Sequence, residues 1–252
     1  MSSPHTQTPR HLGDFVEFLE WLNTQGIEFA VIGGQAVSAY ADLLDQPVRS
    51  EDLDIYVSET TMHELLDRAM AEGLKIIKRP QPRHLPVAVF EAKGLEINAL
   101  TETSGLLPPE IVVRTARSFV LSAHGDLEVP VADPFDLLSN KLSVARDKDR
   151  SHINILRTYV EYEVIEAFLE ESNPRARLKP ARRLLEVLSR KTLPKKLFDR
   201  LIDLATTPVD FRFLASCAPT ENRASRLLDR TSDEALQAEL KSIIASRSFN
   251  EP

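Results

Sequence analysis

The stretch of sequence that decides the fold is Arg49-Ser50-Glu51-Asp52-Leu53-Asp54-Ile55-Tyr56-Val57. It is apolar and β-prone apart from its charged residues, and in a strand residues i and i+2 project from the same face. Asp52 and Asp54 would therefore point at one spot, where their mutual repulsion is costly unless a cation or a proton relieves it. Hard oxygen ligands suit Mg²⁺, which in turn carries phosphates. The stretch predicts a strand that presents a divalent-metal site.

A glycine pair lies upstream of these carboxylates, in Phe29-Ala30-Val31-Ile32-Gly33-Gly34-Gln35-Ala36. The apolar run before it predicts a strand over residues 27–32, and the pattern after it predicts a helix over residues 35–44. Backbone amides at the start of a helix can hold a phosphate. Together the two stretches predict a combined metal and nucleotide site.

The composition is that of an ordinary globular chain of 252 residues, with 42% hydrophobic residues and a formal net charge of −7. The negative charge argues against whole-surface binding to nucleic acid or to an anionic membrane, although a local basic patch could still do either.

Cys217 is the single cysteine, which excludes an intrachain disulfide, a Cys-rich zinc site and a CxxC pair. Residues 1–10 lack the apolar core of a signal peptide, and no apolar run approaches the roughly 20 residues of a membrane span. We expect a soluble cytoplasmic protein that binds no membrane.

Residues 1–150 are predicted to form an α/β domain with a mixed sheet. Helical spacing and stop signals predict two further helices, at residues 12–22 and 60–72, the second with Ser58 as a possible cap. Lys93-Gly94 is a hairpin signal between two of the predicted strands. The β-prone apolar run predicts a strand at residues 52–57, and period-two patterns predict further strands at residues 74–78, 85–92, 95–100, 118–121 and 127–131.

Almost everything from Asp133 onward is predicted to be helical, and no second sheet is indicated. The predicted helices are residues 133–147, 151–171, 175–191, 194–205 and 233–246. We place a soft domain boundary between about residues 132 and 173, and divide the chain into 1–150, a catalytic domain, and 151–252, an all-helical domain for acceptor or partner binding.

The motifs resemble the signature of the DNA polymerase β-like nucleotidyltransferase superfamily. That pattern is an apolar residue with Gly-Gly or Gly-Ser, a helix-containing spacer, and then two acidic residues that alternate with apolar ones; here it is matched by Ile32-Gly33-Gly34 and Asp52-Leu53-Asp54-Ile55. Residues 131–149 are similar to the helix that follows the catalytic sheet in bacterial toxin and antitoxin nucleotidyltransferases. The matching stretches frame about the first 150 residues.

The resemblance implies an α/β nucleotidyltransferase fold and the transfer of a nucleoside monophosphate from an NTP to a hydroxyl, with release of pyrophosphate. It implies Asp52 and Asp54 as catalytic Mg²⁺ ligands, and a third carboxylate on a neighbouring strand that acts as ligand or general base. Glu96 is the candidate, although the family more usually has Asp there. Asn98 is the alternative, because it shares the strand face of Glu96.

The same resemblance implies which residues contact the nucleotide. Gly33 and Gly34 would let the backbone approach the triphosphate, with Gln35 beside them at the start of the helix. Arg49 and Lys141 would balance the phosphate charge, although Arg146 and Lys148 compete with Lys141 for that role.

A basic block stands out in this acidic chain. One interpretation is a solvated helical face that pairs with the acidic residues 161–171, and the other is a docking surface for RNA, such as a tRNA acceptor end, or for an acidic partner protein. Aromatic residues are not interleaved, so base stacking is not supported. Its members are Arg175, Arg177, Lys179, Arg182, Arg183, Arg190, Lys191, Lys195, Lys196 and Arg200.

Three functions remain open at the level of sequence. The first is an active Mg²⁺-dependent nucleotidyltransferase that acts on tRNA or a protein in a toxin–antitoxin-like context. The second is a degenerate antitoxin or regulatory module that binds a nucleotide without transfer, and the third is an aminoglycoside adenylyltransferase.

Overall fold

A computed structural model describes residues 10–81, 86–121 and 125–247 and divides the chain into two compact units, Met1–Tyr159 and Val160–Pro252. The division falls within helix α6 (Arg150–Glu170), and the predicted boundary after residue 150 lies at the start of the same helix. The predicted absence of a signal peptide concerns residues that lie mostly outside the described ranges.

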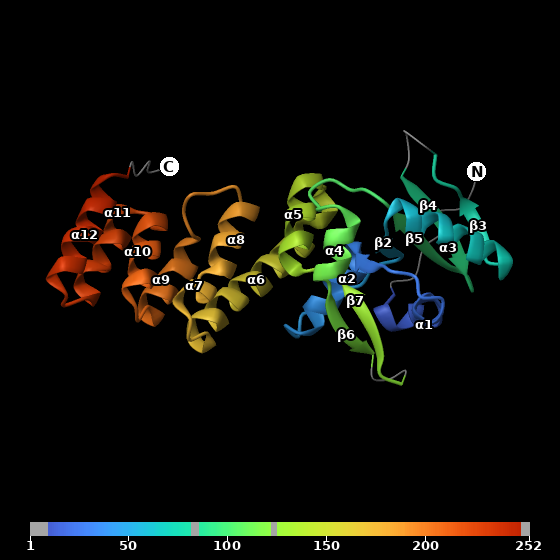
Figure 1. Ribbon diagram of the computed structural model, residues 1–252, viewed down its shortest axis with the longest axis horizontal. Helices are drawn as coiled ribbons and strands as arrows, with labels where there is room; N and C mark the ends of the chain where they lie inside the picture. Colours follow the sequence, from blue (N-terminus) through green and yellow to red (C-terminus); the bar gives the residue numbers. More distant parts are fainter. Residues whose placement is uncertain (1–9, 82–85, 122–124, 248–252) are drawn as a thin grey trace. The chain divides into compact units, whose positions relative to one another are not determined.

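The first unit contains a sheet and the helices that pack on it (Figure 1). Its helical elements are η1 (Leu12–Phe15), α1 (Val16–Thr24), α2 (Gly33–Asp42), α3 (Glu59–Ala71), α4 (Pro109–Thr115), α5 (Pro134–Val144), η3 (Asp147–Asp149) and the first part of α6. Its strands are β1 (Ala30–Ile32), β2 (Leu53–Tyr56), β3 (Lys75–Lys78), β4 (Val87–Ala92), β5 (Leu95–Leu100), β6 (Arg117–Leu121) and β7 (Leu127–Val131).

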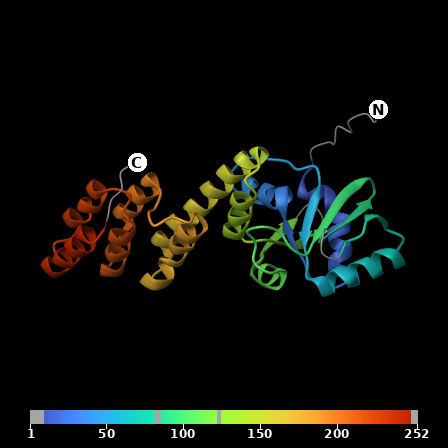
Figure 2. The ribbon, with the colours of Figure 1, turned by 90° about the horizontal axis from the view of Figure 1, so that it is seen from above.

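The described strands form a seven-stranded sheet in the order β3-β4-β5-β2-β1-β7-β6. The sheet is mixed, because β1 pairs with β2 antiparallel but with β7 parallel, and β2 pairs with β5 parallel. Helix α3 runs beside β3 along this sheet (Figure 2). The predicted class, an α/β unit with a mixed sheet followed by a helical region, is confirmed.

Local signals account for several element ends. Ser58 Oγ accepts the Thr61 N–H at 3.0 Å and so caps α3, as predicted. Lys93 and Gly94 both have positive φ, 50° and 78°, which suits a two-residue hairpin turn between β4 and β5. The predicted strand at 85–92 begins at Val87, and residue 85 lies outside the described residues. Helix α4 was not predicted.

Tyr40 of α2 fixes the glycine-led helix to the rest of the first unit. Its hydroxyl donates to the Ala132 carbonyl at 2.9 Å. Its ring contacts the Phe119 ring edge-on, with centroids 5.1 Å apart, and the Tyr159 ring at 4.8 Å. Because Tyr40 is fully buried, these contacts hold α2 against β6 and α6 and thereby set the position of the turn that begins α2.

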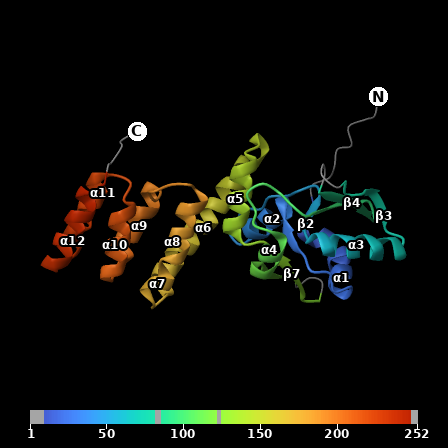
Figure 3. The ribbon, with the colours of Figure 1, turned by 45° about the horizontal axis from the view of Figure 1, so that its top comes forward.

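The second unit is helical throughout its described residues, and its helices follow one another in chain order (Figure 3). They are the end of α6, α7 (Pro174–Arg177), α8 (Lys179–Val187), α9 (Lys195–Leu204), α10 (Pro208–Cys217), α11 (Glu221–Arg226), η4 (Leu228–Arg230) and α12 (Glu234–Ala245). The prediction of one helix over 175–191 is wrong. The helix is interrupted at Leu178, between α7 and α8, and Pro180 lacks the N–H that would continue the hydrogen-bond pattern. Helices α10 and α11 were not predicted. In the described ranges, no helix has the length and apolar character needed to cross a bilayer.

One member of the basic block, Arg177, is buried. Its Nη1 donates to Asp210 Oδ2 at 3.0 Å, and the two side chains are 10% and 0% exposed. Asp210 Oδ2 also accepts the backbone N–H groups of Thr206 and Thr207. The pair therefore ties α7 to the start of α10 and is unavailable to a partner.

We expect Arg177→Ala to destabilise the second unit by about 3 kcal/mol, because it leaves the Asp210 carboxylate buried without its cation. Arg212→Ala is the matched control, since Arg212 pairs with Glu239 where both side chains are nearly half exposed, and it should cost less than about 1 kcal/mol. Urea denaturation followed by the helical circular dichroism signal measures both. Equal losses would contradict the buried-pair argument.

Candidate functional site

The two predicted carboxylates meet at the start of β2. Asp54 pairs with Ile32 in the antiparallel register and with Asn98 in the parallel register. The Asn98 side-chain Nδ2 donates to Asp52 Oδ2 at 3.0 Å and to Asp54 Oδ1 at 3.1 Å. Ser50 Oγ donates to Asp52 Oδ1 at 3.2 Å. The sheet therefore brings Asp52 and Asp54 together, with one amide bridging them.

Asn98 occupies the place that the sequence analysis gave to Glu96. Glu96 lies two residues earlier in β5, where its partner in β4 is Glu91. Within the part of the chain that the structure describes, no three His, Cys, Asp or Glu side chains gather in a group that could hold a metal. The parallel register aligns Asp54 with Asn98, whose side chain makes both hydrogen bonds to the acid pair, whereas Glu96 bonds to neither carboxylate among the described contacts.

The glycine pair lies directly against this acidic site. Gly33 has a φ of +68°, and a Cβ there would overlap Asp54 Oδ2 and stand 2.8 Å from Asp54 Cγ. A Cβ at Gly34 would overlap Ser50 Oγ and stand 2.6 Å from Ser50 Cβ. The family resemblance implies that these glycines let the backbone approach a triphosphate. In the structure, the space that a side chain would need is taken by the site's own residues.

Burial and charge act strongly on Asp54. Burial, followed by the neighbouring Asp52 charge, raises the pKa of Asp54 from 3.8 to about 6. The hydrogen bond from Asn98 and the charges of Lys141 and Arg146 lower this pKa and offset part of the increase. The repulsion inferred from the sequence is therefore present, and a bound cation would relieve it.

Lys141 is the cation that the resemblance assigns to the triphosphate charge. It is buried, and its Nζ forms an ion pair with Asp149 Oδ1 at 3.1 Å. Arg146 donates from Nε to Asp149 Oδ2 at 2.7 Å and keeps half of its side chain exposed. Although burial works in the opposite direction, these two cations hold the pKa of Asp149 at about 2. Arg146 is therefore more accessible than Lys141. Lys148 is exposed as well.

His152 of α6 was not predicted to belong to the site. Its Cε1 would lie 3.7 Å from a Cβ at Gly34, and its Nδ1 lies 3.7 Å from Asp149 Oδ1. Burial, followed by the charge of Lys141, lowers the pKa of His152, so the ring is neutral near pH 7. The buried Nδ1 has no hydrogen-bond partner among the described residues.

The remaining two predicted residues do not reach the acid pair. Gln35 is fully buried, and its Nε2 donates to the backbone carbonyls of Arg10 at 3.3 Å and Ser50 at 3.2 Å. It therefore fastens two backbone segments together. Arg49 is exposed and forms no hydrogen bond or ion pair with any described residue.

The donor set at the start of β2 fits a divalent cation. Asp52 and Asp54 present carboxylate oxygens to one space, and the Asn98 amide next to them carries an oxygen as well as the nitrogen that bridges them. All are hard oxygen donors of the kind that Mg²⁺ prefers. Burial, and then the charge of Asp52, raise the pKa of Asp54, so a cation bound between the two carboxylates would favour the ionised form of Asp54.

Ser50, Asp149 and His152 carried no signal that a single sequence reveals. Ser50 precedes the motif and acts through its closeness to Gly34. His152 is more than one hundred residues from the glycine pair in sequence, so only the folded chain brings them together. Asn98 was considered because residues i and i+2 of a strand share a face.

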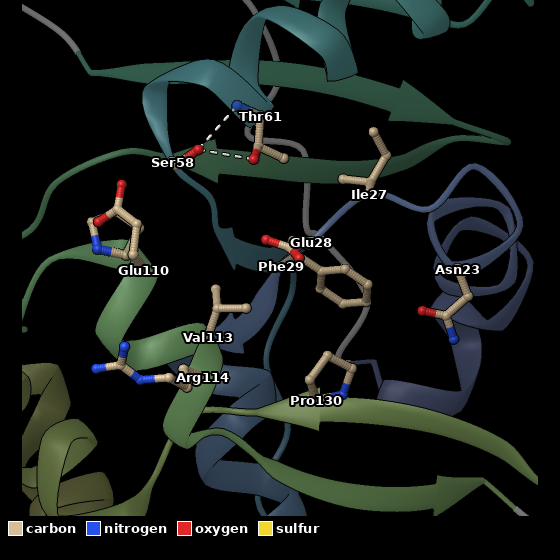
Figure 4. Close-up of a pocket in the computed structure, with 11 residues that line it drawn as sticks. Asn23, Ile27, Glu28, Phe29, Ser58, Thr61, Glu110, Val113, Arg114 and Pro130 are labelled. Carbon is tan, nitrogen blue, oxygen red and sulfur yellow. Dashed lines mark hydrogen bonds between the residues drawn. The ribbon is translucent and has the colours of Figure 1, made fainter.

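A separate pocket of 530 Å³ lies away from this site, at the opposite ends of β1 and β2 (Figure 4). Phe29, just before β1, and Ser58, just after β2, line it, with Glu110 and Arg114 of α4 at its side. Because β1 and β2 are antiparallel, these positions lie at the sheet edge opposite to the acid pair. The pocket contains none of the predicted site residues.

The fold and the site together define an α/β protein with a paired-carboxylate centre beside a glycine turn. The chain matches no protein-family model, and no curated protein matches it significantly. Similar solved structures include a lincosamide antibiotic adenylyltransferase with lincomycin bound, at 11% identity and a TM-score of 0.45, over 60% of this chain and 99% of that one.

Two further structures are similar. One is a candidate nucleotidyltransferase from Thermotoga maritima, at 14% identity and a TM-score of 0.38, over 63% of this chain and 99% of the other. The other is a tRNA nucleotidyltransferase in complex with a primer tRNA and an ATP analogue, at 13% identity and a TM-score of 0.27, over 90% and 83% of the two chains. With TM-scores below 0.5, these similarities carry no argument about the chemistry of this chain, which rests on its own residues.

Proposed function

We propose that this chain is a divalent-cation-dependent nucleotidyltransferase, which transfers a nucleoside monophosphate from an NTP to an acceptor hydroxyl. The observation that carries the proposal is the pair of carboxylates, Asp52 and Asp54, held together by Asn98 against the Gly33-Gly34 turn. The site thus combines two hard anionic ligands with a helix start, and the substrate class that needs both is a cation-bound phosphate.

The reaction forms a bond between the acceptor oxygen and the α-phosphorus of the NTP. It breaks the bond between that phosphorus and the oxygen bridging to the β-phosphate, which leaves as pyrophosphate, and the hydroxyl proton passes to solvent. A Mg²⁺ held by Asp52 and Asp54, with the Asn98 amide oxygen alongside, would neutralise the phosphate charge and polarise the phosphoryl group.

The other residues have positioning roles in this proposal. The backbone amides at the start of α2 offer hydrogen-bond donors to phosphate oxygens, which the helix dipole reinforces. Arg146 presents a half-exposed guanidinium whose orientation Asp149 fixes. Lys141 contributes positive charge from a buried position. The third side chain next to Asp52 and Asp54 is the Asn98 amide, which cannot accept the proton of the acceptor hydroxyl as a carboxylate would.

The test is incubation of the purified chain with each labelled NTP, Mg²⁺ or Mn²⁺, and total RNA, total protein or small alcohols and antibiotics as acceptors. We expect transfer with one acceptor class, and loss of at least about a hundredfold for Asp52→Asn, since charge stabilisation at such centres is worth that much. Glu96→Gln is the matched control and should retain transfer. Transfer to none of these acceptors would reject the proposal.

Two observations favour a second candidate, a module that binds nucleotide without transferring it. Asn98 replaces the third carboxylate, and Asp149 sequesters Lys141. Calorimetry with a non-hydrolysable NTP and Mg²⁺ separates the candidates, because this module would bind the nucleotide while the transfer assay stays blank. A toxin–antitoxin context, a cytoplasmic location and aminoglycosides as acceptors stay predictions.

A further inference from the structure

Helices α9 and α11 of the second unit carry five cationic side chains, two of which pair with Asp199 of α9. We call them the basic cluster: Lys195, Lys196 and Arg200 of α9, and Arg223 and Arg226 of α11. Lys195 and Lys196 lie one helical turn before Asp199 on α9.

Three of the five cations in the basic cluster form no ion pair with any described residue. Arg223 donates from Nε and Nη2 to Asp199 at 3.0 and 2.8 Å, and Arg226 donates from Nη1 to the same carboxylate at 2.8 Å. Lys195, Lys196 and Arg200 are exposed and form no hydrogen bond or ion pair with any described residue. Asp199 therefore pairs with two of the five cations and leaves three without an ion pair among the described residues.

The interpretation of the block as a self-paired helical face applies to only part of it. Arg177 is buried against Asp210, and Arg183 has a partner. The cations of α9 have none, although the chain as a whole carries a net charge of −7. A local surface of unpaired cations on an acidic protein is the charge pattern of a site for a polyanion.

The surroundings of the basic cluster favour nucleic acid over an acidic protein. The core of a protein interface is apolar, often with Tyr, Trp or Phe. The exposed large hydrophobic side chains of the described second unit are Tyr162 and Leu169 of α6, and none lies between residues 174 and 247. Without exposed aromatic rings to stack on bases, the contact would be to the phosphate backbone.

Acceptor groups among these cations favour RNA over DNA. Asp203, one turn beyond Asp199 and Arg200, and Glu221, at the start of α11, are exposed, and their carboxylates bond to no described residue. Beside a DNA backbone such carboxylates only repel phosphate. An RNA backbone carries 2′-hydroxyl donors that can bond to them.

We propose that the basic cluster docks the sugar–phosphate backbone of double-helical RNA, with the cations on phosphates and the neighbouring carboxylates on 2′-hydroxyls. The further claim that such RNA is the acceptor of the reaction rests on the proposed nucleotidyl transfer. RNA binding itself needs neither an NTP nor the acid pair, so its failure and the failure of transfer are separate results.

The test uses the full chain and the triple variant Lys195→Gln, Lys196→Gln, Arg200→Gln, whose side chains bond to no residue that the structure describes. The control removes the same number of exposed cations from the first unit: Lys75→Gln, Lys93→Gln and Arg114→Gln. It matches the triple variant in net charge, although Lys75 and Lys93 also pair with the carboxylates of Glu91 and Glu17. Fluorescence anisotropy with an arbitrary RNA hairpin, the same hairpin in DNA, and polyglutamate as competitor is measured across salt concentrations. We expect the triple variant to bind the RNA hairpin roughly tenfold or more weakly, with a salt slope shallower by about 2 to 3, because each phosphate contact contributes nearly one unit.

The control should bind RNA as the unchanged chain does. Absence of RNA binding at low salt would overturn the proposal, as would equal weakening in the triple and control variants. Equally tight binding of DNA would overturn the assignment to RNA. Displacement by polyglutamate at equal charge concentration would instead identify an acidic protein as the partner.

Discussion

Replacing Gly33 with alanine is expected to abolish nucleotidyl transfer and to destabilise the first unit by about 3 kcal/mol, the sum of a left-handed backbone cost and an overpacking cost. The backbone φ of +68° disfavours any Cβ, and the Cβ would overlap Asp54 Oδ2. Asp54 can move away only by leaving Asn98 and Asp52. The substitution therefore disrupts the acid pair without removing a single functional atom.

Gly73→Ala separates the two causes. Gly73 also has a positive φ, +73°, but nothing lies within 4 Å of the position that its Cβ would take. It should cost about 1 kcal/mol from backbone strain alone and leave transfer unchanged. Unfolding in urea can be followed by the fluorescence of Trp21, the single tryptophan, which lies in the first unit. If Gly33→Ala behaves like Gly73→Ala in both assays, the close approach of Asp54 to the glycine has no role.

The order of elements around the acid pair was predictable because short-range signals determine it. Alternation in residues 52–57 and the glycine pair predicted β2 and the start of α2, both within a few residues of the structure. The third position of the site was not predictable from composition. The parallel pairing of β2 with β5 aligns Asn98, rather than Glu96, with Asp54, and a one-sequence pattern contains no information on that register.

Charged residues were predicted less well than elements, because their partners are distant in sequence or hidden by burial. Lys141 has the expected position after the sheet but pairs with Asp149 inside the protein. Arg177 belongs to the basic block by sequence, yet it is buried against Asp210 in α10, a helix that the sequence analysis missed. Tertiary packing decides which cations of a basic stretch remain available to a ligand.

Asp54→Asn is expected to abolish transfer and yet to stabilise the cation-free protein at pH 8. Burial and the Asp52 charge raise the pKa of Asp54 from 3.8 to about 6 in the folded state. A carboxyl group whose pKa is raised on folding contributes stability below its unfolded pKa, and this contribution is lost as the pH rises towards the folded pKa. Ionised Asp54 therefore disfavours the folded state above about pH 6, by about 3 kcal/mol for a shift of this size.

An asparagine at position 54 keeps an oxygen to accept the Asn98 hydrogen bond but has no charge to desolvate. In EDTA, the variant should exceed the unchanged protein in stability at pH 7 to 8, and the advantage should shrink as the pH falls from about 6 to about 4, where Asp54 is protonated in the folded state. Asp67→Asn, an exposed carboxylate of α3, is the control and should change stability by less than about 0.5 kcal/mol. Urea denaturation at each pH, with Trp21 fluorescence, measures the difference.

Added Mg²⁺ should stabilise the unchanged protein more than the variant, because only the former retains both carboxylates. A variant that is less stable at pH 8 without a cation would mean that Asp54 makes favourable contacts that outweigh its burial and its repulsion from Asp52.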